Sequence, residues 1–200
     1  MLSSSRTTAL LSSMMAVLFP LYWFSEFGLF MERKFFPPAT DVFRWGDAFT
    51  LVIMFLGVAL LVSCRKSLGQ HIQHQVTRFA AITLTAILSL SCLLFITVRT
   101  VEVFATNPPT FDAYHPVSSI MLAVSVTGLI SASLLGLSLQ ALEKRIAPPV
   151  KLAGLMLFIA VIAPFLSLGM LLPVAPVLVT LALISLAFHC WQADSSVDLI

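Results

Sequence analysis

The chain has 200 residues, of which 59% are hydrophobic and only 10% are charged, and its mean hydropathy is +1.02. A soluble domain carries roughly 25% charged residues, so this composition could not build a surface that faces water. The formal net charge of +2 does not predict nucleic-acid binding, and Cys64, Cys92 and Cys190 lack the spacing of a disulfide framework or zinc module.

Long apolar runs dominate the sequence. A helix needs about 20 apolar residues to cross the hydrocarbon of a bilayer. Lipid requires every spanning backbone to satisfy its own hydrogen bonds, and continuous apolar runs favour helices over barrel strands. We therefore predict an all-α, polytopic integral membrane protein with one transmembrane domain over residues 1–200. The predicted spans are 7–30, 48–64, 79–99, 116–142, 152–172 and 174–192.

The last charge-free run, from Leu152 to Ala193, is too long for one span. Pro173 and Pro176 lie near its middle, and proline removes a helix donor and clashes with the preceding turn. These residues predict a tight hairpin between helices five and six. One long tilted helix with a surface tail is the alternative.

The distribution of Lys and Arg predicts the orientation, because cytoplasmic segments carry an excess of these residues. With the N-terminus inside, the inner loops are 65–78 and 143–151, and the outer loops are 31–47 and 100–115. The inner segments then hold more Lys and Arg than the outer ones: Arg6, Arg65, Lys66, Arg78, Lys144, Arg145 and Lys151. Both termini are expected in the cytoplasm, with the bacterial inner membrane as the expected location.

The first outer loop concentrates charged and aromatic residues. Acidic and basic residues alternate there, and Pro37-Pro38 interrupts the chain. This pattern favours an ordered contact surface over an active site. The candidate contact residues are Glu32, Arg33, Phe35, Phe36, Arg44 and Trp45.

A second candidate is an outer charge cluster of Glu26, Arg99 and Glu102. Arg99 and Glu102 are three apart on one predicted helix, and Glu26 could pair with Arg99 across helices. A charge at the hydrocarbon edge needs a partner or water. The cluster is interpreted either as ion pairs that fix helix ends or as part of an outer sensing site.

Gly128, Ala132 and Gly136 are spaced four apart and form a candidate helix-packing face. Small residues at this spacing let two helix backbones approach closely. The neighbour could be another helix of the same chain or a second copy of the protein.

Catalytic and cofactor sites are not predicted. No Asp, Glu, Lys, Arg or His lies near the middle of a predicted span, where ion coupling or buried haem would need one. Imidazole and thiolate groups near the inner face are possible metal ligands, but they would come from three separate segments and match no metal-binding motif. These residues are Cys64, His71, His74, His189 and Cys190. Outer acids such as Glu32, Asp41 and Asp47 lie beside basic residues, which favours solvated ion pairs over acid–base chemistry.

These patterns favour a non-enzymatic membrane subunit. It would lie in the lipid bilayer, associate with itself or with another protein, and anchor or sense for a partner complex. The alternative is a small-solute or ion permeation protein. In that case Pro20 and Pro164 would break their helices and free backbone carbonyls, and mid-helix hydroxyls would line a path.

Overall fold

The computed structural model describes residues 4–35, 45–104, 111–167 and 173–195, and this part of the chain is helical without strands. Its six helices are α1 (Ser4–Phe35), α2 (Trp45–Leu68), α3 (Gln75–Phe104), α4 (Phe111–Ala141), α5 (Pro148–Leu166) and α6 (Val174–Ser195). Five of them contain a stretch long and apolar enough to cross a membrane. The apolar part of α5, Pro148–Pro164, is shorter. The prediction of an all-helical protein with membrane-spanning helices is therefore confirmed at this level.

The helices on both sides of the predicted outer loops extend further than the charge-free runs. α1 continues through Phe35, α3 continues through Phe104, and α4 begins at Phe111. The predicted loop 31–47 is thus helical at both of its ends, and all of the described part of 100–115 is helical as well. Charged residues mark the end of an apolar stretch, but Glu, Arg and Lys are good helix formers and need not end a helix.

Prolines lie at the start of α5, near its end, and in the first turn of α6. Pro148 begins α5, where its missing N–H would have had no partner, and the Ala147 carbonyl accepts the first bonds from Val150 and Lys151. Pro164 lies inside α5, which ends two residues later at Leu166, six residues before the predicted end. Pro176 is buried in the first turn of α6. The last apolar run is therefore two helices, and the single long helix is excluded.

Pro20 does not break α1, contrary to the expectation of a helix break there. A proline inside a helix removes one donor, and the carbonyl one turn earlier loses its partner. Helices in membranes tolerate this loss where neighbouring groups satisfy the backbone.

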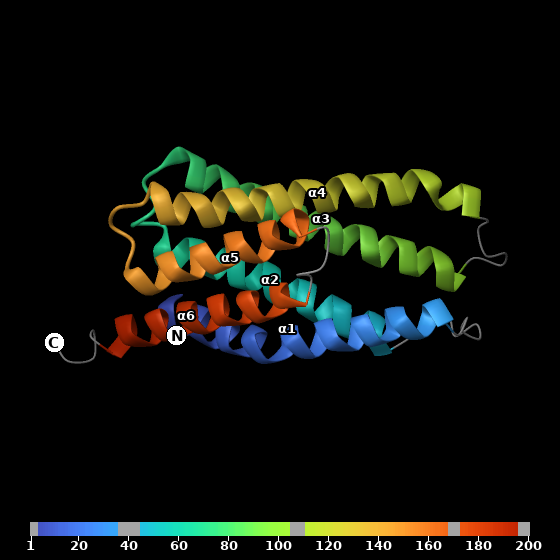
Figure 1. Cartoon of the computed structure of the whole chain (residues 1–200), viewed down its shortest axis with the longest axis horizontal. Coiled ribbons are helices and arrows are strands. Elements are labelled where there is room, and N and C mark those ends of the chain that lie inside the picture. The colour runs from blue at the N-terminus through green and yellow to red at the C-terminus, as the bar shows by residue number, and fades with distance from the viewer. Residues whose placement is uncertain (1–3, 36–44, 105–110, 168–172, 196–200) are drawn as a thin grey trace.

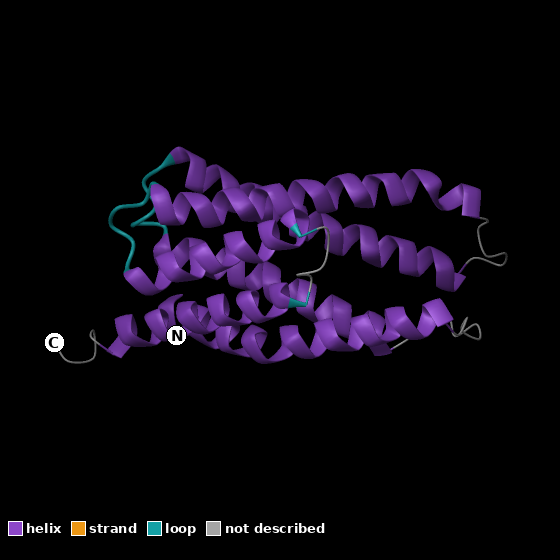
Figure 2. Cartoon of the chain, viewed as in Figure 1, coloured by secondary structure: helices purple, strands orange, loops and turns teal. Residues whose placement is uncertain are grey.

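The six helices form a closed ring in chain order (Figure 1). Among the described residues, close backbone contacts join each helix to its two neighbours in sequence, and α1 closes the ring against α6. Both ends of the chain and the connections 69–74 and 142–147 lie at one end of the bundle, as the loops in Figure 2 show. Following the predicted orientation, we refer to this end as the inner end and to the opposite one as the outer end.

The buried apolar residues form three clusters. One lies between α1, α2 and α6 around Met15, Ile53 and Leu60. A second, at the inner end, joins α2 to α5 through Leu68 and Val150. The third, between α3 and α4, is built from small residues and Leu135: Ala80, Ala81 and Leu135.

Large apolar side chains are also exposed on every one of the six helices. Examples are Val17, Phe55, Leu93, Leu122, Leu166 and Phe188. Water would not tolerate such a continuous apolar surface, whereas lipid hydrocarbon does. This surface agrees with a protein embedded in a membrane.

Candidate functional sites at the two ends of the bundle

The predicted outer contact surface falls mostly outside the described part of the structure. Glu32, Arg33 and Phe35 belong to the end of α1, and Trp45 begins α2, but only their backbone is described. Phe36 and Arg44 lie outside the described residues. The contact-surface prediction stays a prediction.

The residues of the outer charge cluster lie on two helices that do not touch. Glu26 is in α1, whereas Arg99 and Glu102 are in α3, and their side chains are outside the described part. In the described residues α2 contacts both helices, and α1 makes no contact with α3. The Glu26–Arg99 pair therefore stays a prediction.

The predicted packing face of α4 meets other helices of the same chain. A Cβ added at Gly136 would lie 2.5 Å from the carbonyl oxygen of Gly154 in α5. One added at Gly128 would lie 3.2 Å from a methyl carbon of Ile87 in α3. Ala132 between them is buried. Glycine at position 136 thus lets α4 and α5 approach to backbone contact.

The outer half of α4, defined here as residues 119–130, is exposed over most of its circumference. Only Val124 and Gly128 among the residues with a described side chain there are half-buried. The cause is visible in Figure 1: α5 and α6 end part-way along the bundle, whereas α1 to α4 continue to the outer end. With its 19 residues α5 spans about 28 Å, against about 46 Å for the 31 residues of α4.

A second series of small residues runs along this exposed part of α4. Ser119, Ala123 and Thr127 are each four apart, and all three are exposed. The Thr127 hydroxyl donates to the Ala123 carbonyl, 2.7 Å away, within the same helix. Ala123 and Thr127 thus present small, exposed side chains beyond the end of α5.

Hydroxyl groups connect α1 to its two neighbours near the inner end. The buried Thr8 and Ser63 hydroxyls are hydrogen-bonded at 2.7 Å, which joins α1 to α2. Ser12 donates to the Leu183 carbonyl at 2.7 Å, which joins α1 to α6. Both bonds are made where no water can replace them, so they fix the relative positions of the three helices.

Several hydroxyls on α3, α4 and α6 form hydrogen bonds within their own helix and not between helices. Thr85, Ser89 and Ser91 in α3, Ser133 in α4 and Thr180 in α6 each donate to the carbonyl four residues earlier in their own helix. This bond satisfies a hydroxyl that would otherwise face hydrocarbon. The mid-helix hydroxyls expected to line a permeation path therefore have their protons engaged within single helices.

At the inner end, Glu143 connects two loops that the sequence did not predict to meet. Its side chain is buried, and its two carboxylate oxygens accept the backbone N–H groups of Gln73, at 3.2 Å, and His74, at 3.0 Å. The His74 carbonyl accepts from Arg78 at the start of α3, so the carboxylate lies at the N-terminus of that helix. An anion is stabilised there by the helix dipole and the unpaired N–H groups.

Sequence reasoning missed this contact because Glu143 is a single acidic residue between an apolar helix and basic neighbours. Its position after the last apolar residue of α4 resembles an ordinary exposed helix end. A buried carboxylate without a nearby cation needs several N–H donors. Only the fold brings those donors from a segment some seventy residues earlier.

Several candidate metal ligands also lie near one another at the inner end. Cys64 and Cys190, and likewise His71 and His189, are close enough to interact electrostatically. Among the residues that the structure describes, however, no group of three or more His, Cys, Asp or Glu could hold a metal ion. The candidate ligands at the inner face therefore do not form such a group in the described part of the chain.

Comparison with protein-family models, with curated proteins and with solved structures finds no match for this chain. Its function must therefore be argued from its own geometry.

Proposed function

We propose that this chain is a non-enzymatic, multi-pass membrane subunit that assembles with a second copy of itself. The proposed topology has six spans with both termini in the cytoplasm, and the proposed location is the bacterial inner membrane. The outer ends of α1 to α4 would then present the contact residues around Glu32 and Arg44 to a partner complex.

The exposed outer half of α4 is the observation that carries the proposal. Helices in a membrane associate where small residues allow close packing, because lipid offers no hydrophobic driving force between them. Ser119, Ala123 and Thr127 provide such a surface where α5 no longer covers α4. Two copies related by a two-fold axis could place the same surface against itself.

The permeation alternative has less support. α1 continues across Pro20, and Thr85 and Ser89 of α3 use their hydroxyls within the helix. The buried hydroxyls that cross between helices are paired with each other or with a backbone carbonyl. None of these groups is arranged along a continuous polar path in the part of the chain described.

Cysteine cross-linking in native membranes tests the self-association. In a background without Cys64, Cys92 and Cys190, Ala123→Cys should form a disulfide-linked dimer under mild oxidation. Leu93→Cys is the matched control, since Leu93 is also exposed but lies on α3. Thr127→Leu should abolish the Ala123→Cys cross-link, because its larger side chain would separate the helices.

Three results would count against the proposal. Equal cross-linking at positions 93 and 123 would indicate random collisions in the membrane. A monomeric mass in mild detergent, with no cross-link at position 123, would exclude the dimer. Stoichiometric recovery of a different protein at position 123 would replace the second copy by that partner.

A further inference from the structure

Cations from three segments surround the inner end of the bundle. Arg78 lies in the first turn of α3, Lys144 and Arg145 lie in the connection between α4 and α5, and Arg65 and Lys66 end α2. All five side chains are exposed. Within the described residues no carboxylate forms an ion pair with any of them.

Glu143, the acidic residue beside Lys144, does not neutralise this surface. Its side chain is only 2% exposed, and its oxygens accept N–H groups of the preceding connection. The carboxylate is thus directed into the protein, while the two basic residues that follow it face outward. Because the Glu143 carboxylate is buried, the exposed surface of the connection 142–147 is more positive than its sequence suggests.

The same contact brings together the chain segments that carry three of the cations. Glu143 is held against Gln73 and His74, so Lys144 and Arg145 lie beside the start of α3. Arg78 is one helical turn after His74 and donates its backbone N–H to the His74 carbonyl. Arg65 and Lys66, by contrast, belong to the end of α2 and take no part in this contact.

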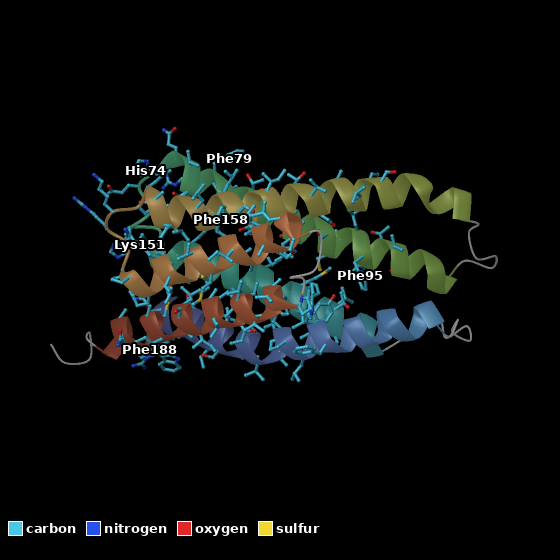
Figure 3. The ribbon with its side chains drawn as sticks, in the orientation of Figure 1. His74, Phe79, Phe95, Lys151, Phe158 and Phe188 are labelled. Atoms are coloured by element: carbon cyan, nitrogen blue, oxygen red, sulfur yellow. The ribbon has the colours of Figure 1, made fainter. Side chains whose placement is uncertain are left out.

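Exposed apolar side chains lie next to these cations. Val76 and Phe79 flank Arg78, and Leu142 precedes Glu143; all three are exposed, Phe79 at 67%. Figure 3 places His74 and Phe79 toward the inner end of the bundle, with Lys151 of α5 at the same end. A ligand here would meet positive charge and hydrocarbon-facing side chains at once.

We propose that Arg78, Lys144 and Arg145 bind the phosphate headgroup of an anionic phospholipid, with its acyl chains against Val76, Phe79 and Leu142. Anionic headgroups attract basic residues near the membrane surface. Arg and Lys beside exposed apolar groups suit a ligand with a charged head and an apolar tail. Glu143 is a positioning residue, because it holds the two connections together without facing the lipid.

The test uses the full chain in nanodiscs, with phosphatidylglycerol mixed into phosphatidylcholine and bound lipid counted by native mass spectrometry. The wild type should retain phosphatidylglycerol preferentially. Lys144→Gln/Arg145→Gln should weaken that preference by about tenfold or more, since each basic residue contributes roughly fivefold. Arg65→Gln/Lys66→Gln removes the same charge at the same end and should change the preference clearly less, because these residues take no part in the Glu143 contact.

An equal loss in both double variants would overturn the proposal in favour of diffuse electrostatic attraction. An unchanged preference in Lys144→Gln/Arg145→Gln would overturn it directly. Binding of inorganic phosphate without any preference for phosphatidylglycerol would indicate a site for free anions and would overturn the lipid site. Thermal unfolding in pure phosphatidylcholine checks the fold of each variant, and Arg78→Gln alone provides the same test if the double variant is unstable.

Discussion

Glycine 136 shows how much one missing side chain can determine in this bundle. Its position on α4 lies directly over the backbone of α5, where an added Cβ would approach both the Gly154 carbonyl and the Phe158 amide nitrogen. Backbone atoms cannot rotate away as side-chain ends can. The separation of α4 and α5 is therefore set by the absence of a Cβ at this position.

Gly136→Ala should lower the free energy of unfolding by about 1–3 kcal/mol, because α4 and α5 would have to separate. Gly57→Ala is the control. Its Cβ would meet only the end of the Leu88 side chain, at 2.9 Å, which can move, and alanine favours helix by about 1 kcal/mol. Unfolding in mixed micelles by SDS titration would measure both. Equal destabilisation by both substitutions would show that backbone contact at Gly136 does not limit the separation of α4 and α5.

Glu143→Ala should destabilise the protein by about 1–3 kcal/mol, because the Gln73 and His74 amides would lose an ionised acceptor. Glu143→Gln keeps the shape and one acceptor oxygen, and should have a smaller effect. Proteolysis of the 69–74 connection, compared with that of the wild type, would locate the change. A wild-type stability for Glu143→Ala would mean that water replaces the carboxylate without cost.

At the scale of the elements, the two sides of the ring are held together by different interactions. α1 is joined to α2 and α6 by hydroxyl bonds between helices, at Thr8–Ser63 and Ser12–Leu183. α4 is joined to α5 by close backbone packing at Gly136 and Gly154. Hydroxyls of α3 make local bonds instead, and the contact between α2 and α3 is the smallest in the ring. The α2–α3 interface is therefore the place where the ring should open most easily.

Thr8→Val should cost about 0.6–1.7 kcal/mol, the range measured for hydrogen bonds between membrane helices. Thr85→Val is a matched control, because Thr85 bonds only to the Ala81 carbonyl of its own helix. It should change the stability by less than about 0.5 kcal/mol. A double-mutant cycle of Thr8→Val with Ser63→Ala would isolate the coupling across α1 and α2, and a coupling near zero would contradict this account.

For the whole molecule, the orientation in the membrane remains a prediction with a direct test. Gln73→Cys, at an exposed position of the inner end, should be protected from a membrane-impermeant maleimide in intact cells and react after permeabilisation. Ala39→Cys, in the predicted outer loop and outside the described residues, should react without permeabilisation. The reverse pattern would invert the topology, and reaction at both positions would contradict the single span, α2, that is proposed to separate them.

The sequence was sufficient for the fold class and for the number of helices. Apolar runs and proline positions are local properties, and lipid imposes helical hydrogen bonding on any segment that crosses it. The ends of the helices were less predictable, since charged residues such as Glu32 continue a helix beyond the hydrocarbon.

The tertiary structure decided which polar and small residues meet. Glu143 reaches the start of α3, Thr8 reaches Ser63, and Gly136 reaches Gly154 only because the helices close into a ring. Such contacts join segments far apart in the sequence, where no local pattern records the partner. The sequence by itself determined that the protein consists of membrane-compatible helices, because burial in lipid is a property of each helix. The paired surfaces, and the exposed half of α4, depend on where neighbouring helices end.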